Sequence, residues 1–266
     1  MHFTVLVIGD DYDKILAPFN EQPDEDDTDC LDHCYWSCDA ANGEEYTADT
    51  KVELEQEVLA AGTTIQNGPW LSNSQGYWDW YVLGGRWSGT LKLKNNATGI
   101  KGEPDSNMST TDSALIKDID FDGMYDEATT KAAITYDKIM TIFGELPIHL
   151  SQKEIQEKCR DKHGTIDYSK ANIMYQEQPR LIALNTVSEA ESTFPFFIDA
   201  DDFFISREEY IELAKFQRIS THSIIDAEGV WYSRDDSSYE EYQKLFKDII
   251  ASLSPDTRIS IIDCHV

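Results

Sequence analysis

Basic residues are scarce in this chain. It has 22 lysines and arginines against 50 aspartates and glutamates, which gives a formal charge of −28 at pH 7. A field of this sign repels nucleic-acid phosphates and anionic membranes, and it attracts basic proteins and cations. We therefore expect no direct nucleic-acid binding. Either a basic protein is the partner, or the acidity serves only to keep the protein in solution.

Long apolar runs are also absent: no stretch approaches the roughly 20 residues that cross a bilayer. The segment Met1 to Ile8 is apolar, but it lacks the positively charged start of a signal peptide and predicts a strand instead. The five cysteines are an odd number and are not spaced like a disulfide framework. We expect no membrane association and a cytoplasmic location in a reducing compartment.

Signatures of catalysis are missing too. The chain has no G-x-S-x-G, no P-loop and no G-x-G-x-x-G. A strand would point Cys264 to the face opposite Asp263 and His265, so His265 could not readily activate that thiol. Asp263 and His265, with His2 nearby on the first strand, leave an acid–base role open, but we favour a polar pair in a sheet. A non-enzymatic function is preferred.

The apolar pattern predicts an α+β fold. Both ends of the chain, His2 to Ile8 and Arg258 to Val266, predict strands, and we expect them to be adjacent in one mixed or antiparallel sheet with several helices packed on it. Apolar residues recur every three or four positions from Tyr125 to Phe143 and predict a helix. Further helix starts are predicted where Ser or Thr precedes Glu by three residues, at Thr50, Ser151, Ser206 and Ser238.

The acidity is concentrated near the N-terminus. Residues 10–49 contain fourteen acidic residues and one lysine, Lys14, and we expect an acidic loop region there. We predict a single domain over residues 1–266, with an insertion or boundary at 95–117. The acidic surface most suited to a basic partner is predicted at Asp24, Glu25, Asp26, Asp27 and Asp29.

The most distinctive stretch is aromatic. Apolar runs on both sides of Gly84 and Gly85 predict a tight hairpin turn, because glycine accepts positive φ angles. We expect Trp78 and Trp80 on one face of a strand, and Arg86 is a rare positive charge. Alternatively the stretch is core, with Arg86 paired to a carboxylate such as Asp79. The candidate ligand or partner surface is Trp78, Trp80, Arg86 and Trp87.

Two groups suggest metals. Asp118, Asp120 and Asp122, followed by Gly123, match the first half of a calcium loop. The twelfth position is Thr129 rather than the bidentate glutamate, so the alternative is a turn that leads into the next helix. A calcium site is kept as one hypothesis.

Zinc-ligand residue types also gather in one short segment. Cys30, His33, Cys34 and Cys38 lie within nine residues, which is awkward for a tetrahedral site. On a helix the three cysteines would form one stripe, and we favour a buried stripe over zinc.

Four segments together resemble a family. HFTVLVIG (2–9), WDWYVLGGRWSG (78–89), DIDFDGM (118–124) and IDCHV (262–266) are similar to a group of uncharacterised proteins encoded by bacteriophages and bacterial mobile elements. The resemblance implies a phage accessory protein, made inside a bacterial cell, that acts on host machinery or host defences. It carries over no catalytic residue.

Three functions follow as hypotheses. The first is a non-enzymatic phage accessory protein, for host takeover or anti-defence, that binds a basic host protein surface by nucleic-acid mimicry. The second is a small-molecule or nucleotide-binding, sequestering protein that uses the Trp78 to Trp87 surface. The third is a calcium-dependent interaction module at Asp118 to Asp122.

Overall fold

The computed structural model describes residues 1–24, 33–102, 109–190 and 199–266. It contains two compact units, unit 1 (residues 1–121 with 219–266) and unit 2 (residues 122–218). The sequence predicts one domain with an insertion or boundary at 95–117, and this stays a prediction. The two compact units divide the chain after Phe121, at the start of helix α3, and after Arg218, which follows helix α7.

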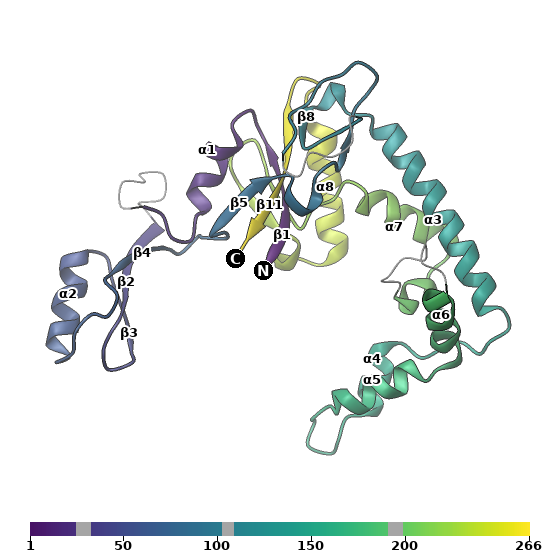
Figure 1. The fold of residues 1–266 in the computed structure, drawn as a ribbon, viewed down its shortest axis with the longest axis horizontal. Helices are drawn as coiled ribbons and strands as arrows, with labels where there is room; N and C mark the ends of the chain where they lie inside the picture. Colours follow the sequence, from purple (N-terminus) through teal and green to yellow (C-terminus); the bar gives the residue numbers. More distant parts are fainter. Residues whose placement is uncertain (25–32, 103–108, 191–198) are drawn as a thin grey trace. The chain divides into compact units, whose positions relative to one another are not determined.

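Unit 1 is built on a six-stranded mixed sheet, which confirms the α+β class. The strand order is β10-β9-β1-β11-β5, and β8 also pairs with β11. The terminal strands are adjacent, as predicted: β1 runs antiparallel to β11 from His2, opposite His265, to Ile8, opposite Ile259 (Figure 1). The strands are β1 (His2–Ile8), β5 (Trp80–Leu83), β8 (Ser113–Leu115), β9 (Ser223–Ile225), β10 (Trp231–Ser233) and β11 (Arg258–His265).

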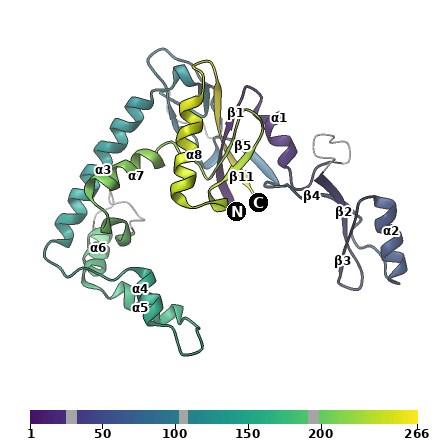
Figure 2. The ribbon, with the colours of Figure 1, turned by 180° about the vertical axis from the view of Figure 1, so that it is seen from behind.

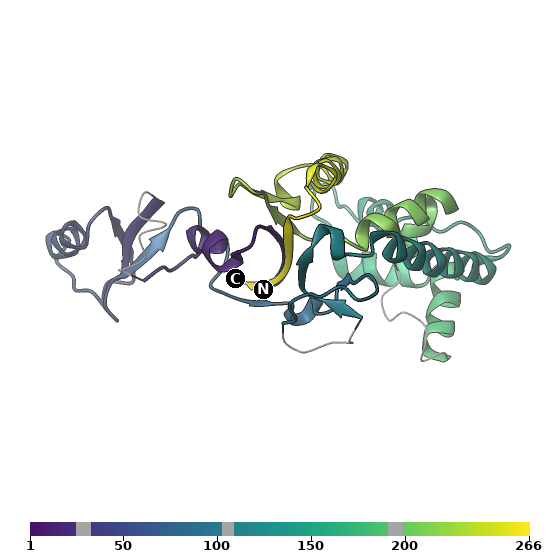
Figure 3. The same cartoon turned by 90° about the horizontal axis from the view of Figure 1, so that it is seen from above.

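Strand alternation buries both faces of β1. Val5 and Val7 belong to a core that includes Leu16 of helix α1 (Tyr12–Leu16) and Phe19 of the following 3-10 turn η1 (Ala17–Phe19). Leu6 and Ile8 point to the opposite face and are equally buried. Figure 3 shows the chain ends N and C side by side, where β1 begins and β11 ends.

The last helix of unit 1, α8 (Tyr239–Ser252), begins with the predicted capping box. The Ser238 side chain accepts a hydrogen bond from the backbone N–H of Glu241, and the Glu241 carboxylate accepts one from the backbone N–H of Ser238. The helix buries Tyr242 and Phe246, and the Tyr242 hydroxyl donates to the carbonyl of Thr221 at 3.0 Å. Its cap and its apolar face therefore agree with the sequence pattern.

The predicted hairpin at Gly84 is wrong. Strand β5 ends at Leu83 and pairs with β11, not with the residues that follow the glycines. After Gly84 the chain forms the 3-10 turn η3 (Gly85–Trp87), and β6 (Leu91–Lys92) pairs with β7 (Thr110–Thr111). Both glycines do have positive φ, +77° and +52°, so the predicted turn conformation is confirmed although the predicted strand partner is wrong.

A small three-stranded sheet with one helix takes in the last part of the region predicted as an acidic loop, residues 34–49, and continues beyond it. We call residues 34–73 the acidic lobe: β2 (Cys34–Asp39), β3 (Glu45–Ala48), helix α2 (Lys51–Ala60) and β4 (Trp70–Asn73), with order β3-β2-β4. Helix α2 contacts β2 and β3 and buries Leu54 and Val58 with Cys38 and Ala40 (Figure 1). The predicted helical cysteine stripe is therefore wrong, because Cys34 and Cys38 lie in a strand. Cys30 lies outside the described residues.

Unit 2 is helical in its described residues (Figure 2). Its helices are α3 (Phe121–Phe143, whose first residue still belongs to unit 1), α4 (Gln152–Lys158), α5 (Tyr168–Gln176), α6 (Pro179–Ala190) and α7 (Arg207–Gln217). The predicted capping boxes at Ser151 and Ser206 are both present. Of the helices in the described ranges, none combines the length and apolarity that a bilayer crossing needs.

Candidate functional site

The glycines of the aromatic motif surround two buried carboxylates. A Cβ on Gly85 would lie 2.5 Å from the Cβ of Asp263, and one on Gly84 would lie 2.7 Å from the carboxyl carbon of Asp112. Asp112, fully buried, accepts hydrogen bonds from the backbone N–H groups of Gly89 (2.5 Å) and Gly102 (2.8 Å). Only glycine permits this approach, so the motif is explained by the packing of two carboxylates that are distant in sequence.

Asp263 also belongs to a cluster of two histidine–aspartate pairs at the end of the sheet. Its Oδ1 lies 2.8 Å from His2 Nδ1, and its Oδ2 accepts the backbone N–H of Arg86 at 2.9 Å. His265 Nδ1 lies 2.9 Å from Oδ1 of Asp79, and the two imidazole centroids are 5.0 Å apart. The expectation that His2 lies near Asp263 and His265 is confirmed.

The protonation chemistry of this cluster is partly determined by burial. Burial opposes ionisation of Asp79, but the hydrogen bond and charge of His265 outweigh it and lower the pKa of that carboxyl. Cys264 points to the opposite face, where burial raises the pKa of the thiol. A buried thiol with a raised pKa is a poor nucleophile, in agreement with the sequence prediction that His265 does not activate it.

The predicted aromatic surface is divided by the structure. Trp78 is buried, and its indole N–H donates to the carbonyl of Leu16 at 3.1 Å, whereas Trp80 is 44% exposed and stacks on His265. The prediction that Trp78 and Trp80 share a face is wrong, because β5 starts only at Trp80. Trp87 is half-buried in η3. Arg86 is exposed and forms no ion pair with a described residue, and Asp79 pairs with His265 instead.

A cavity of about 520 Å³ opens beside this cluster within unit 1. Its aromatic lining joins three distant segments: Tyr77 precedes β5, Trp231 starts β10, and Phe3 lies in β1. The Tyr77 and Trp231 rings stack at a centroid distance of 4.5 Å and an interplanar angle of 4°. We call this cavity the Tyr77 pocket. The sequence gives no sign of it because Tyr77, Trp231 and His222 carry no local motif, are far apart in the chain and come together only in the folded unit.

The acidic lobe is rich in exposed negative charge. Seven of its residues are acidic and all seven are exposed: Asp39, Glu44, Glu45, Asp49, Glu53, Glu55 and Glu57. Its single Lys or Arg, Lys51, lies 4.7 Å over the ring of Trp36. Of the predicted acidic surface, Asp24 is exposed, while Glu25, Asp26, Asp27 and Asp29 lie outside the described residues.

The predicted calcium residues do not converge in the structure. Asp118 ends the 3-10 turn η4 (Ile116–Asp118), Asp120 lies 3.5 Å from Lys92 Nζ, and Asp122 is in the first turn of α3. Across the described ranges, no three His, Cys, Asp or Glu residues form a group that could hold a metal ion. Calcium therefore stays a prediction without geometric support.

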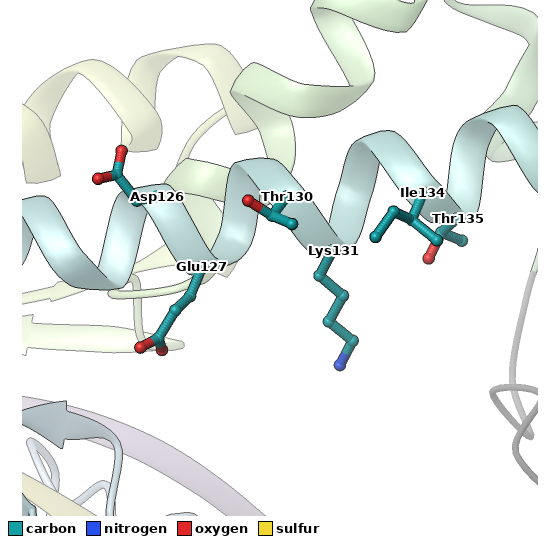
Figure 4. A pocket seen from close by; sticks show the side chains of 6 residues that line it. All are labelled: Asp126, Glu127, Thr130, Lys131, Ile134 and Thr135. Atoms are coloured by element: carbon teal, nitrogen blue, oxygen red, sulfur yellow. The ribbon is translucent and has the colours of Figure 1, made fainter.

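A second depression lies along α3 in unit 2 (Figure 4). Its lining side chains all come from that one helix, where Asp126, Thr130 and Ile134 follow one another at intervals of four residues. Ile134 is 63% exposed. This is a helix face rather than an enclosed site.

No family model matches the chain, and no curated protein or solved structure matches it. The candidate site therefore rests on its own geometry. It consists of Gly84 and Gly85 packed against the buried carboxylates of Asp112 and Asp263, two histidine–aspartate pairs, the Tyr77 pocket and the acidic lobe.

Proposed function

We propose that this protein is a non-enzymatic bacteriophage accessory protein that binds a basic host protein in the bacterial cytoplasm. The observation that carries the proposal is the acidic lobe, where seven exposed carboxylates accompany one lysine that already lies over Trp36. The phage origin rests on the resemblance of the four sequence segments. The partner surface is one that otherwise binds nucleic acid, because a dense array of carboxylates resembles a phosphate backbone in charge.

The lobe is suited to this role because its charges are held on a folded scaffold. Leu54, Val58, Cys38 and Ala40 form its own small core. Thr50 caps α2 by accepting the backbone N–H of Glu53 at 3.2 Å. Ordered carboxylates lose less conformational entropy on binding than the same charges on an unstructured segment.

Charge also differs between the units. Unit 1 contains 32 acidic and 11 basic residues, and unit 2 contains 18 and 11. Unit 1 therefore holds most of the excess negative charge. A basic partner is attracted to unit 1 more strongly than to unit 2, and the attraction is screened by salt because the charges are exposed.

The test is a pull-down from bacterial lysate with three forms of the full chain. The lobe variant neutralises three exposed carboxylates that do not cap a helix, as E45Q/E55Q/E57Q. The matched control neutralises three exposed carboxylates of unit 2, as D126N/E177Q/E208Q. Wild type and control should recover the same basic protein at low salt and less of it at moderate salt.

The lobe variant should bind that protein about tenfold more weakly, because three exposed ion pairs contribute about 0.5 kcal/mol each. Excess duplex DNA should release the partner if the docking face is a nucleic-acid-binding one. Recovery of no basic protein at either salt, or equal recovery by the lobe variant, would refute the proposed function.

A further inference from the structure

The Tyr77 pocket has the chemistry of a cation site. Its lining combines the stacked rings of Tyr77 and Trp231 with three carboxylates, Glu21, Asp235 and Asp236. An aromatic face attracts a cation through the ring quadrupole, and a neighbouring carboxylate adds a direct ion pair. About 520 Å³ is within the range of small-ligand sites.

The carboxylates are available to a ligand to different degrees. Asp235 Oδ2 lies 3.2 Å from His222 Nε2, so this carboxylate already has a partner. The side chains of Glu21 and Asp236 form no ion pair with any residue that the structure describes. Arg234 is the single Lys or Arg in the described lining, so carboxylates outnumber guanidinium groups three to one.

Glu21 is held firmly beside the aromatic stack. Its backbone N–H donates to the carbonyl of Trp78 at 2.8 Å, and its carbonyl accepts the N–H of Asn73 at 2.9 Å. A Cβ on Gly76 would lie 2.5 Å from the Cα of Glu21, so a glycine is needed for the two segments to approach this closely. The carboxylate and the Tyr77 ring therefore line the pocket from a backbone fixed by hydrogen bonds.

A second polar group at this site lacks a partner. The indole Nε1 of Trp231 is buried and has no hydrogen-bond partner among the described residues. A buried donor left unpaired costs about 1–3 kcal/mol. Because this nitrogen has almost no solvent-exposed surface, a ligand in the pocket contacts the Trp231 ring rather than its N–H group.

We infer that the Tyr77 pocket binds an arginine side chain presented by a basic protein. A planar guanidinium stacks on Tyr77 and donates hydrogen bonds to the carboxylates of Glu21 and Asp236. Lysine is a poorer fit because its ammonium is compact and strongly hydrated. This inference rests on the proposed function in one respect only, namely that the natural source of the arginine is the basic partner.

The primary test is an NMR titration of the ¹⁵N-labelled full chain with N-acetyl-arginine methylamide. The indole N–H signal of Trp231, assigned with Trp231→Phe, should shift and saturate, while that of Trp78 should not move. The citrulline analogue keeps the planar shape without the charge, and the lysine analogue keeps the charge without the plane. Arginine should bind at least about fivefold more tightly than either. Equal dissociation constants, or no shift at Trp231, would overturn the inference.

Variants of the pocket residues test whether it binds a cation rather than an anion. Tyr77→Ala, at a 40% exposed position, should weaken arginine binding at least about fivefold, whereas Tyr168→Ala at a 65% exposed position of α5 should leave it unchanged. Unchanged indole signals of Trp36, Trp70 and Trp87 in the free Tyr77→Ala protein establish that it folds, whereas the Trp231 signal shifts because its stacking partner is removed. Arg234→Ala should tighten binding because it removes the opposing charge. Weaker binding by Arg234→Ala would mean that the pocket takes an anion and would overturn the inference.

The proposed function and the arginine site can be refuted independently of each other. The lobe variant should keep the arginine titration and lose the partner. If the arginine titration succeeds while the pull-down recovers no basic protein, the pocket stands and the proposed function fails. If the partner is recovered but Trp231 does not respond to arginine, the reverse holds.

Discussion

Replacing Gly85 by alanine tests the conclusion that a glycine is needed at this position because the buried carboxylate of Asp263 packs directly against it. Gly85 has a φ of +52°, and an L side chain in this region costs about 1–2 kcal/mol. The new Cβ would also lie 2.5 Å from the Cβ of Asp263 and would displace that buried carboxylate. Asp263 would then lose a charge-assisted hydrogen bond to Arg86 N–H or His2, at about 1.5–3 kcal/mol. The expected loss of stability is about 3–5 kcal/mol.

The matched control is Gly229→Ala. Gly229 has a φ of +78°, and a Cβ there would meet no atom within 4 Å. This variant carries the backbone cost without the collision, so we expect a loss of about 1–2 kcal/mol. The difference between the two variants isolates the contact with Asp263.

The assay is urea unfolding followed by tryptophan fluorescence. All six tryptophans lie in unit 1, so the signal reports that unit and not the helices of unit 2. Gly85→Ala should lower the unfolding midpoint well below that of Gly229→Ala, with a similar m-value. Equal unfolding midpoints for the two variants would refute the conclusion that Gly85 is needed to make room for Asp263.

Three further predictions concern other sites. Burial lowers the pKa of His149 despite the nearby Asp201, so the unfolded chain binds the proton more tightly than the folded one. The contribution of His149 to the free energy of unfolding is therefore complete above about pH 6.5 and falls as the pH drops below that value. Urea unfolding followed by circular dichroism at about pH 7.5 and 5.5 will measure this loss. Burial raises the pKa of Cys264, so its thiol should resist alkylation at pH 8 in the native protein and react after denaturation, as mass spectrometry of the labelled peptides will show. Ser238→Ala removes the capping box with Glu241 and should cost about 1 kcal/mol, whereas Ser238→Asp should keep most of the stability in the same denaturation assay.

Each of these has a contrary outcome. His149→Gln should reduce the loss of stability between pH 7.5 and 5.5; an unchanged loss would assign the pH dependence to other groups. Rapid native alkylation of Cys264 would show that its face of the sheet opens to solvent. Equal stability of Ser238→Ala and wild type would show that the cap does not limit α8.

Local pattern was a reliable guide wherever a structure depends on near neighbours. The capping boxes at Ser151, Ser206 and Ser238 form as predicted, because the two hydrogen bonds of each box join residues only three positions apart. The long helix was also predicted, and the structure starts it four residues earlier, at Phe121. The apolar terminal strands pair as predicted because both needed full burial.

Tertiary structure decided which distant segments meet. The pattern around Gly84 and Gly85 indicated a hairpin turn, but strand pairing joins β5 to β11. The two glycines instead leave room for the carboxylates of Asp112 and Asp263. Likewise Trp78 and Trp80 look equivalent in sequence, yet one is core and the other surface, because the strand begins between them.

The sequence by itself determined the acidity, the fold class, most helix starts and the adjacency of the two ends, since each follows from composition, periodicity or near-neighbour hydrogen bonds. Only the tertiary structure decided that residues 34–49 of the acidic segment belong to a folded lobe and that Tyr77, Trp231 and Glu21 line one pocket. These three residues are about 55 to 210 positions apart in sequence, so their common place in one pocket depends on the packing of unit 1 as a whole.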